Sequence, residues 1–316
     1  MEMLTLRKSK NLALSETFDD YINKCKVRNL SESTISMYSM HFEMFKRFLN
    51  EPNFMTKELT PVIVDRFILY LRQRGCNDMT VLSYLRDIRA FFYYCMEEEL
   101  IPRFKIKMPK AQKRIKETYT DEELRILLKK PEMKKIDFTE YKIWVFSNYL
   151  LATGNRISSV LDLKIGNLDF ANGVIQVDKT KNRKAQIIPM AQSLMDILRE
   201  YLIYRRGEAD DYLFCNVYGG KGEIRTYQNL LYKYNRAKGV EKTSAHLYRH
   251  TFAKKWILNG GDIFRLQKML GHSDLTIVRE YVNMFGKDLS KDFELFNPLD
   301  NLNATRRGSN PSLKIG

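Results

Sequence analysis

Apolar side chains recur at three- and four-residue intervals from about residue 13 to residue 101. Two segments that show this spacing are formed by Ile35, Tyr38, Phe42, Phe45 and Phe48, and by Leu82, Leu85, Ile88, Phe91 and Phe92. The spacing places apolar groups along one face of a helix, whereas a strand requires alternation. Helix starts are indicated by Ser31 and Asp78, and Pro61 stands where a first helical turn tolerates proline. The sequence therefore predicts a compact bundle of four helices.

The chain changes character after a basic stretch that contains prolines. Residues 104–117 hold Pro109 and many lysines and arginines. This composition indicates a solvated linker, or one that lies along phosphates between two DNA-binding lobes. Beyond it, β character is confined to IGNLDF, VIQV and QIIPM, which two polar turns separate. Helical patterns resume at about 192–206, 226–237, 244–259, 262–270 and 274–284. The predicted fold is mainly α with a small antiparallel sheet (α+β).

The composition favours a polyanionic partner. Lys and Arg number 53 against 38 Asp and Glu, for a formal charge of +15. Such a field attracts nucleic acid, although a solvated basic surface would give the same count. The cysteines form no C-x-x-C pair, which argues against a zinc site or a disulfide framework. No apolar run is long enough to span a membrane, so we expect a soluble, cytoplasmic protein.

The segment HLYRH holds two of the four histidines of the chain. In a helix capped near Ser244, positions i, i+3 and i+4 share one face, so His246, Arg249 and His250 point the same way. A metal would use the imidazoles, but the fixed positive charge of the arginine would repel it. A guanidinium flanked by imidazole donors suits an anion. The segment therefore predicts an anion site and no metal.

Three further short motifs accompany this box. Arg156 follows a Thr-Gly-Asn break where a helix is expected to begin. The polar turn between the last two strands presents Lys179, Lys181, Arg183 and Lys184. His272 stands in a Leu-Gly-His motif, and Tyr281 follows nine residues later. Each motif alone is weak, because a single tyrosine on an amphipathic helix usually belongs to the core and a lysine-rich turn is usually solvated.

Taken together and in order, these motifs resemble those of the tyrosine recombinase (phage integrase) family. That family carries an arginine after Thr-Gly, a lysine on a β-hairpin turn, a His-x-x-Arg-His box, a Leu-Gly-His box and a later tyrosine. The corresponding residues of this sequence are Arg156, Lys181, His246 to His250, His272 and Tyr281. The resemblance covers most of 118–285, and the helical front block resembles the core-binding domain of the family.

The resemblance implies a C-shaped clamp around DNA, with five segments along the chain. We expect an N-terminal segment (1–12), a helical DNA-binding domain (13–103), a basic linker (104–117), a catalytic domain (118–295) and a C-terminal tail (296–316). Basic residues expected to contact DNA are Lys179, Arg183, Lys184, Lys113, Arg114 and Lys116.

The resemblance also implies a role for each residue of the motifs. Tyr281 would attack the phosphorus and hold it as an ester. Arg156 and Arg249 would clamp the nonbridging oxygens without a metal or other cofactor, while His246 and His272 add hydrogen bonds. Lys181 fits best as the general acid for the departing 5′ oxygen, with Lys179 and Lys184 as alternatives. His250 would accept or relay the tyrosine proton.

Two positions depart from the family pattern. An acidic residue commonly stands three positions after the first arginine, and here that residue is Ser159. Because such an acid acts by bracing the cations, we expect its loss to weaken preorganisation without abolishing activity. The leucine that usually precedes the second arginine is Tyr248.

The implied function is site-specific DNA recombination (integration, excision or resolution) through a 3′-phosphotyrosine intermediate and a Holliday junction. The family works as a homotetramer on two DNA duplexes, so the apolar residues after Tyr281 are expected to pack on a neighbouring subunit or on their own domain. Accessory recombination factors are left open, and the nucleoid is the expected location. The alternatives are a DNA-binding protein of the same fold without catalysis and a type IB topoisomerase.

Overall fold

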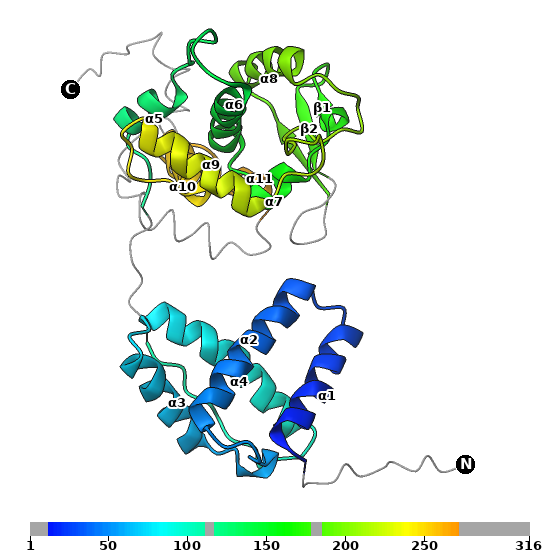
Figure 1. The fold of residues 1–316 in the computed structure, drawn as a ribbon, viewed down its shortest axis with the longest axis vertical. Helices are drawn as coiled ribbons and strands as arrows, with labels where there is room; N and C mark the ends of the chain where they lie inside the picture. The colour runs from blue at the N-terminus through cyan, green and yellow to red at the C-terminus, as the bar shows by residue number, and fades with distance from the viewer. Residues whose placement is uncertain (1–11, 111–116, 178–184, 272–316) are drawn as a thin grey trace, which may run out of the picture. The chain divides into compact units, whose positions relative to one another are not determined.

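The computed structural model describes residues 12–110, 117–177 and 185–271 (Figure 1). The chain divides into two compact units, Met1–Arg114 and Ile115–Gly316. The helices of the first unit are α1 (Leu14–Val27), α2 (Glu32–Leu49), the 3₁₀ turn η1 (Thr56–Glu58), α3 (Pro61–Gln73) and α4 (Asp78–Glu97).

Helix α4 is the centre of the first unit, because α1, α2 and α3 all pack against it. Aromatic rings fill the interface. Phe18 stacks on Phe42 with centroids 3.7 Å apart, and Phe91 presents its edge to both rings at 5.3 and 5.5 Å. Such offset and edge contacts add to the stabilisation that burial of these large rings provides. The predicted four-helix bundle is confirmed.

The segment that follows α4 is partly anchored. Ile101 and Ile106 are buried in the core of the first unit, and Phe104 and Met108 pack against it. The composition of 104–117 predicts a linker, but the apolar side chains at 104, 106 and 108 extend the packed part of this unit. Lysine at the alternating positions 105 and 107 faces away and gives the segment its linker-like composition.

The second unit contains seven helices and a small sheet among its described residues. The elements are α5 (Asp121–Leu128), α6 (Phe138–Thr153), α7 (Ile157–Leu161), η2 (Ile165–Asn167), β1 (Leu168–Asp169), β2 (Val174–Val177), β3 (Gln186–Pro189), α8 (Gln192–Arg205), α9 (Ile224–Ala237), α10 (Ala245–Leu258) and α11 (Ile263–Leu270).

Helix α6 runs through the middle of this unit (Figure 1). It contacts α5, α8, α9 and α10 and is apolar around most of its circumference, which is typical of a buried helix. Its start is fixed by Asp137, whose carboxylate accepts a hydrogen bond from the Glu140 amide at 2.7 Å. Its end is fixed by Gly154 in the left-handed conformation.

The sheet is antiparallel with the order β1-β2-β3. Ile175 pairs with Ile188, and both are buried, so one face of the sheet lies on the core. The predicted mainly α fold with a small antiparallel sheet is confirmed. The first part of IGNLDF differs, because Ile165 and Gly166 donate their amides to Asp211 and Ala209 and form a 3₁₀ turn before β1 begins.

Capping interactions fix several helix starts. Thr120 and Glu123 form the expected capping box of α5, with hydrogen bonds of 2.7 and 3.2 Å. Ser244 caps α10 by accepting from the His246 amide at 3.2 Å. At α4 the capping side chain is Asn77, which accepts from the Thr80 amide at 2.9 Å, and Asp78 is the first helical residue.

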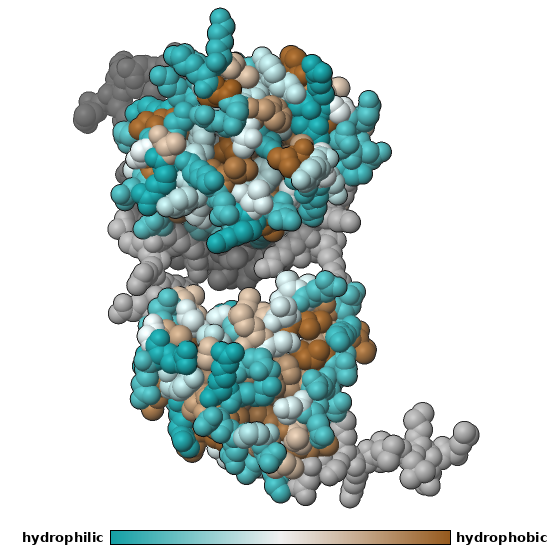
Figure 2. All heavy atoms as spheres, viewed as in Figure 1, coloured by the Kyte–Doolittle hydropathy of each residue, from teal (hydrophilic) through white to brown (hydrophobic). Residues whose placement is uncertain are grey.

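Hydrophobic side chains stand singly or in small groups among hydrophilic ones on the visible face of each unit (Figure 2). Scattered exposure of this kind is normal for a globular surface. One example is Tyr218, which is 92% exposed in the turn closed by the bridge between Cys215 and Lys221. In the part of the chain that the structure describes, no helix combines the length and hydrophobicity needed to cross a bilayer.

Lys142 is buried on α6, and its Nζ donates to the Cys215 carbonyl at 2.9 Å. Burial lowers the pKa of this amine below its ordinary value of 10.5, because desolvation disfavours the charged form. Between the lowered folded-state pKa and 10.5, the unfolded chain holds a proton that the folded chain lacks. Stability therefore rises with pH across this window.

We expect Lys142→Met to remove this pH dependence. Relative to the variant, the wild-type protein should gain about 1.4 kcal/mol of unfolding free energy for each pH unit between the two pKa values. Denaturant titrations of both proteins from pH 7 to pH 10.5 measure the difference. Parallel curves over this range would contradict the assignment.

Candidate anion-binding and catalytic site

Arg156 and Arg249 reach the same backbone carbonyl from different helices. Arg249, on α10, donates from Nη2 to the Leu270 oxygen and from Nη1 to the Gly154 oxygen, both at 2.8 Å. Arg156, at the N-terminus of α7, donates to the Leu270 oxygen in a longer contact of 3.4 Å. Leu270 ends α11, where the helix dipole is negative. The negative helix end thus holds two cations side by side.

The Thr153-Gly154 break positions the first arginine. Gly154 has φ 64°, a conformation that favours glycine, and ends α6. A Cβ at this position would lie 2.5 Å from Cδ1 of Phe252, so the close approach of α10 also requires glycine. The chain turns here and α7 begins after Arg156, as the motif predicts.

Burial strengthens the attraction of the two arginines for an anion. Arg249 is 5% exposed and Arg156 is half-buried. Desolvation lowers the pKa of Arg156 from its ordinary value, yet an arginine remains protonated in proteins. Two guanidinium groups in a partly desolvated site attract an anion more strongly than they would in water. The arrangement is suited to the oxygens of a phosphate.

The two histidines of the box lie on α10, the helix that carries Arg249. The rings of His246 and His250 are stacked, with centroids 6.0 Å apart and planes 17° from parallel. His246 is exposed and His250 is half-buried, so both imidazoles are at least partly accessible to solvent. The helical spacing that places both on the face of Arg249 is the one that the sequence indicates.

The remaining predicted residues lie outside the described residues. They are Tyr281, His272, Lys181, Lys179, Arg183, Lys184, Lys113, Arg114 and Lys116. Their roles stay predictions. The described chain reaches Gly271, the residue before His272, and flanks the lysine-rich turn at Val177 and Ala185.

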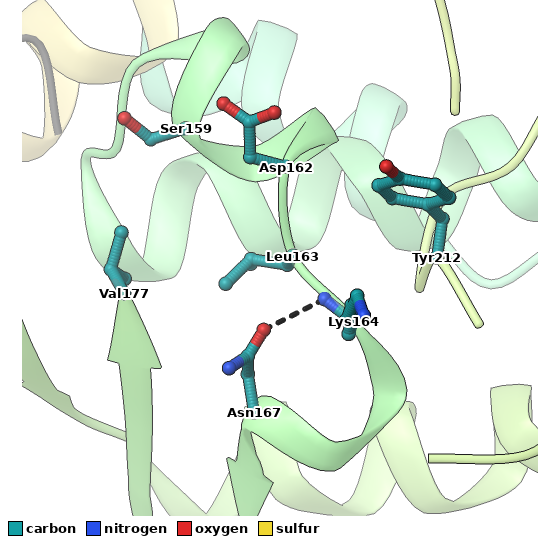
Figure 3. A pocket seen from close by; sticks show the side chains of 7 residues that line it. All are labelled: Ser159, Asp162, Leu163, Lys164, Asn167, Val177 and Tyr212. Atoms are coloured by element: carbon teal, nitrogen blue, oxygen red, sulfur yellow. Dashed lines mark hydrogen bonds between the residues drawn. The ribbon is translucent and has the colours of Figure 1, made fainter. Parts of the chain in front are cut away.

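Ser159 borders a cavity of about 150 Å³ (Figure 3). Ser159 and Asp162 reach it from α7, Val177 from the end of β2, and Asn167 from η2, where its Oδ1 accepts from the Lys164 amide at 2.8 Å. Asp162 forms an ion pair with Lys221. Ser159, which stands where the family commonly has an acidic residue, therefore places a short side chain beside this cavity.

Tyr248, the other departure, belongs to the core. It is fully buried and packs on Tyr119, with ring centroids 4.6 Å apart. Burial raises the pKa of Tyr248 to about 12, because a phenolate is disfavoured away from water. Its ring supports α10 from behind, on the side opposite the histidine stack.

Sequence reasoning missed three groups at the site. Two are the carbonyls of Gly154 and Leu270, which no residue type reveals. The third is Gln186, the first residue of β3, whose Nε2 donates to the Lys268 and Met269 carbonyls at 2.5 and 2.6 Å. These partners are more than eighty positions along the chain, so no local pattern signals the contact.

Two arginines that share one carbonyl, with an imidazole pair on the helix of the second, form a cationic group suited to proteins that bind phosphodiesters. Among residues 12–110, 117–177 and 185–271, no group of three or more His, Cys, Asp or Glu side chains could hold a metal ion.

Comparison with known sequences identifies the family. The profile of the phage integrase family matches residues 117–287, and that of the phage integrase SAM-like domain matches residues 13–115. The chain belongs to the phage integrase family. The expected family and the expected enzyme class, a tyrosine recombinase that breaks and rejoins DNA, are confirmed.

Relatives match the chain over nearly their whole length. Tyrosine recombinase XerD of Listeria monocytogenes is 27% identical over 303 residues, which cover 90% of this chain and 99% of the relative. Tyrosine recombinase XerA of Pyrococcus furiosus is 28% identical over 293 residues, which cover 91% and 96%.

Two solved structures share the fold. The XerH site-specific recombinase bound to a palindromic difH substrate has a TM-score of 0.68 at 23% identity, covering 86% of this chain and 82% of that chain. A lambda integrase dimer bound to a core site has a TM-score of 0.69 at 17% identity, covering 91% and 82%.

Proposed function

We propose that this protein recombines DNA at a specific duplex site, as a homotetramer that joins two duplexes and passes through a Holliday junction. The observation that carries the proposal is the convergence of Arg156 and Arg249 on the Leu270 carbonyl. Groups held in this way need little reorganisation when charge develops on a phosphate, which is the main source of catalysis by such donors. The relatives described above act as recombinases, which agrees with this role.

The first chemical step is an in-line exchange of esters. The Tyr281 oxygen attacks the scissile phosphorus while its proton passes to His250. The bond from phosphorus to the 5′ oxygen breaks, and that oxygen takes a proton from Lys181. Arg156 and Arg249 hold the nonbridging oxygens, with His246 and His272 as further donors. The phosphotyrosine ester conserves the bond for rejoining.

Strand exchange follows by reversal of the same chemistry. The 5′ hydroxyl of a partner duplex attacks the phosphotyrosine, Lys181 recovers the proton, and Tyr281 leaves with a proton from His250. One pair of protomers forms the junction and the other pair resolves it.

DNA contact is assigned to two basic segments. Lys113, Arg114 and Lys116 lie at the boundary of the two units along the sequence, and Lys179, Arg183 and Lys184 are close in sequence to the proposed general acid, Lys181. Contacts with backbone phosphates dominate affinity in such interfaces. We place the protein in the cytoplasm, on the nucleoid, where its substrate is found.

Identification of the site comes first in the test. DNA that remains attached to the protein after denaturation of expressing cells is recovered and sequenced, and one shared sequence is expected. Two differently labelled duplexes carrying that sequence are then incubated with purified protein. We expect recombinant duplexes and four-way junctions.

The two alternative functions give different products. Relaxation of supercoiled DNA without transfer between duplexes would indicate a topoisomerase. Binding to the recovered sequence without any covalent species would indicate a DNA-binding protein without catalysis. Recombination that starts only when cell extract is added would point to accessory factors.

A further inference from the structure

The C-terminal end of α11 is held by side chains from three elements. A helix ends with carbonyls that lack intrahelical donors. Gln186 of β3 donates to the Lys268 and Met269 oxygens, and the next oxygen, that of Leu270, accepts from Arg156, the cap of α7, and from Arg249 of α10. Three consecutive carbonyls therefore connect the sheet to both arginines.

Gln186 occupies a junction between two parts of the site. It begins β3 and pairs with Val177, the last residue of β2, so along the sequence it closely follows the segment that contains Lys181. Across from it, α11 packs against β3 and leads to Gly271 and His272. One half-buried amide thus connects the start of β3 to the C-terminal end of α11.

Gly271 permits this close arrangement. It has φ 60°, in the left-handed region. A Cβ at this position would lie 3.2 Å from Oε1 of Gln186 and 3.8 Å from Nη1 of Arg156. Glycine therefore leaves room for the Gln186 amide at the helix end, whereas the distance to Arg156 is that of an ordinary van der Waals contact.

We infer that Gln186 is a positioning residue for the two catalytic arginines, because it fixes the helix end whose last carbonyl orients both of them. The inference rests on the proposed function. Gln186 acts through the Leu270 carbonyl and is assigned no contact with DNA. If the helix end moves, both guanidinium groups lose the hydrogen-bond acceptor that they share. Misplacement of a catalytic group by about 1 Å can lower the rate by about 10²-fold.

The chemistry of the side chain specifies the tests. Methionine has a similar size but no N–H donor, so Gln186→Met removes the hydrogen bonds alone. Glutamate has the same shape but presents an oxygen to two carbonyl oxygens, so Gln186→Glu should repel the helix end. Arginine retains N–H donors, and the negative end of α11 accommodates the added charge, so Gln186→Arg should restore function.

The experiment measures single-turnover cleavage of a nicked duplex, duplex affinity and melting temperature for the full chain. We expect cleavage to fall about tenfold in Gln186→Met and about 10²-fold in Gln186→Glu, with affinity changed less than about twofold. Gln186→Arg should cleave within about threefold of wild type. Gln192→Met is the matched control, since this exposed glutamine bonds only locally to Asp196 among the contacts described, at 2.8 Å.

The outcomes separate this inference from the function on which it rests. A wild-type protein that forms no covalent species contradicts the proposed function itself. If wild type cleaves and Gln186→Met cleaves equally well, the positioning role is wrong. The role is also wrong if cleavage, affinity and melting temperature fall together, or if arginine fails to restore the rate, because either result would show a merely structural residue.

Discussion

Replacing Tyr281 with phenylalanine is expected to abolish the covalent complex with DNA while leaving duplex affinity unchanged. Only the phenolic oxygen is lost, and no other group of the site can hold the phosphorus as the same ester. A nicked suicide substrate that carries the site should trap wild-type protein in a species that survives SDS. The variant should give none, a loss limited only by the detection threshold.

Tyr218→Phe is the matched control for this experiment. Tyr218 is 92% exposed in a turn of the same unit and is assigned no role, so its variant should form the adduct normally. An adduct that persists in Tyr281→Phe at wild-type yield would mean that another residue is the nucleophile.

Replacing Arg249 with alanine is expected to cause a large loss of cleavage. Removing one preorganised donor from an anion site costs about 2.7–4 kcal/mol of barrier, so cleavage should fall about 10²–10³-fold with little change in duplex affinity. Stability should fall as well, by about 1–3 kcal/mol, because the buried Gly154 and Leu270 carbonyls lose their charged partner. Single-turnover cleavage and denaturant unfolding measure the two losses.

Other arginines provide the comparison. Arg156→Ala should lose cleavage to a similar extent with a smaller loss of stability, since Arg156 is half-buried and its contact with Leu270 is longer. Arg199→Ala should change neither quantity appreciably, because Arg199 is exposed on α8, pairs loosely with Asp196 at 3.7 Å and lies over the Phe170 ring at 5.2 Å, and exposed contacts of both kinds contribute little. Near-wild-type cleavage by Arg249→Ala would refute its assigned role.

The sequence predicted features that depend on neighbouring residues. The capping box of Thr120 and Glu123, the helix that starts at Ser244 and the break at Gly154 are each specified within a few positions. The start of α4 shifts by one residue because asparagine and aspartate are both good caps, and only the hydrogen bond to Thr80 identifies Asn77.

Features that depend on distant residues were not predictable. The approach of Arg156 and Arg249 was inferred from the family, but the shared Leu270 carbonyl and the contact of Gln186 with α11 arise only from packing. Composition also misled at 104–110, where charged residues alternate with apolar ones that lie on the core. A short segment in which lysines alternate with apolar residues has the same composition as a solvated linker, so composition alone does not reveal that its apolar side chains are packed.

The acceptor that orients both arginines belongs to the main chain, and this limits how the site can vary. Any amino acid at position 270 retains that oxygen, so drift in sequence can change the leucine without separating the two cations. With both arginines in place, a movement of the helix end displaces the shared acceptor of the two side chains at once. Substitutions elsewhere that shift the end of α11 are therefore expected to change the positions of Arg156 and Arg249 together.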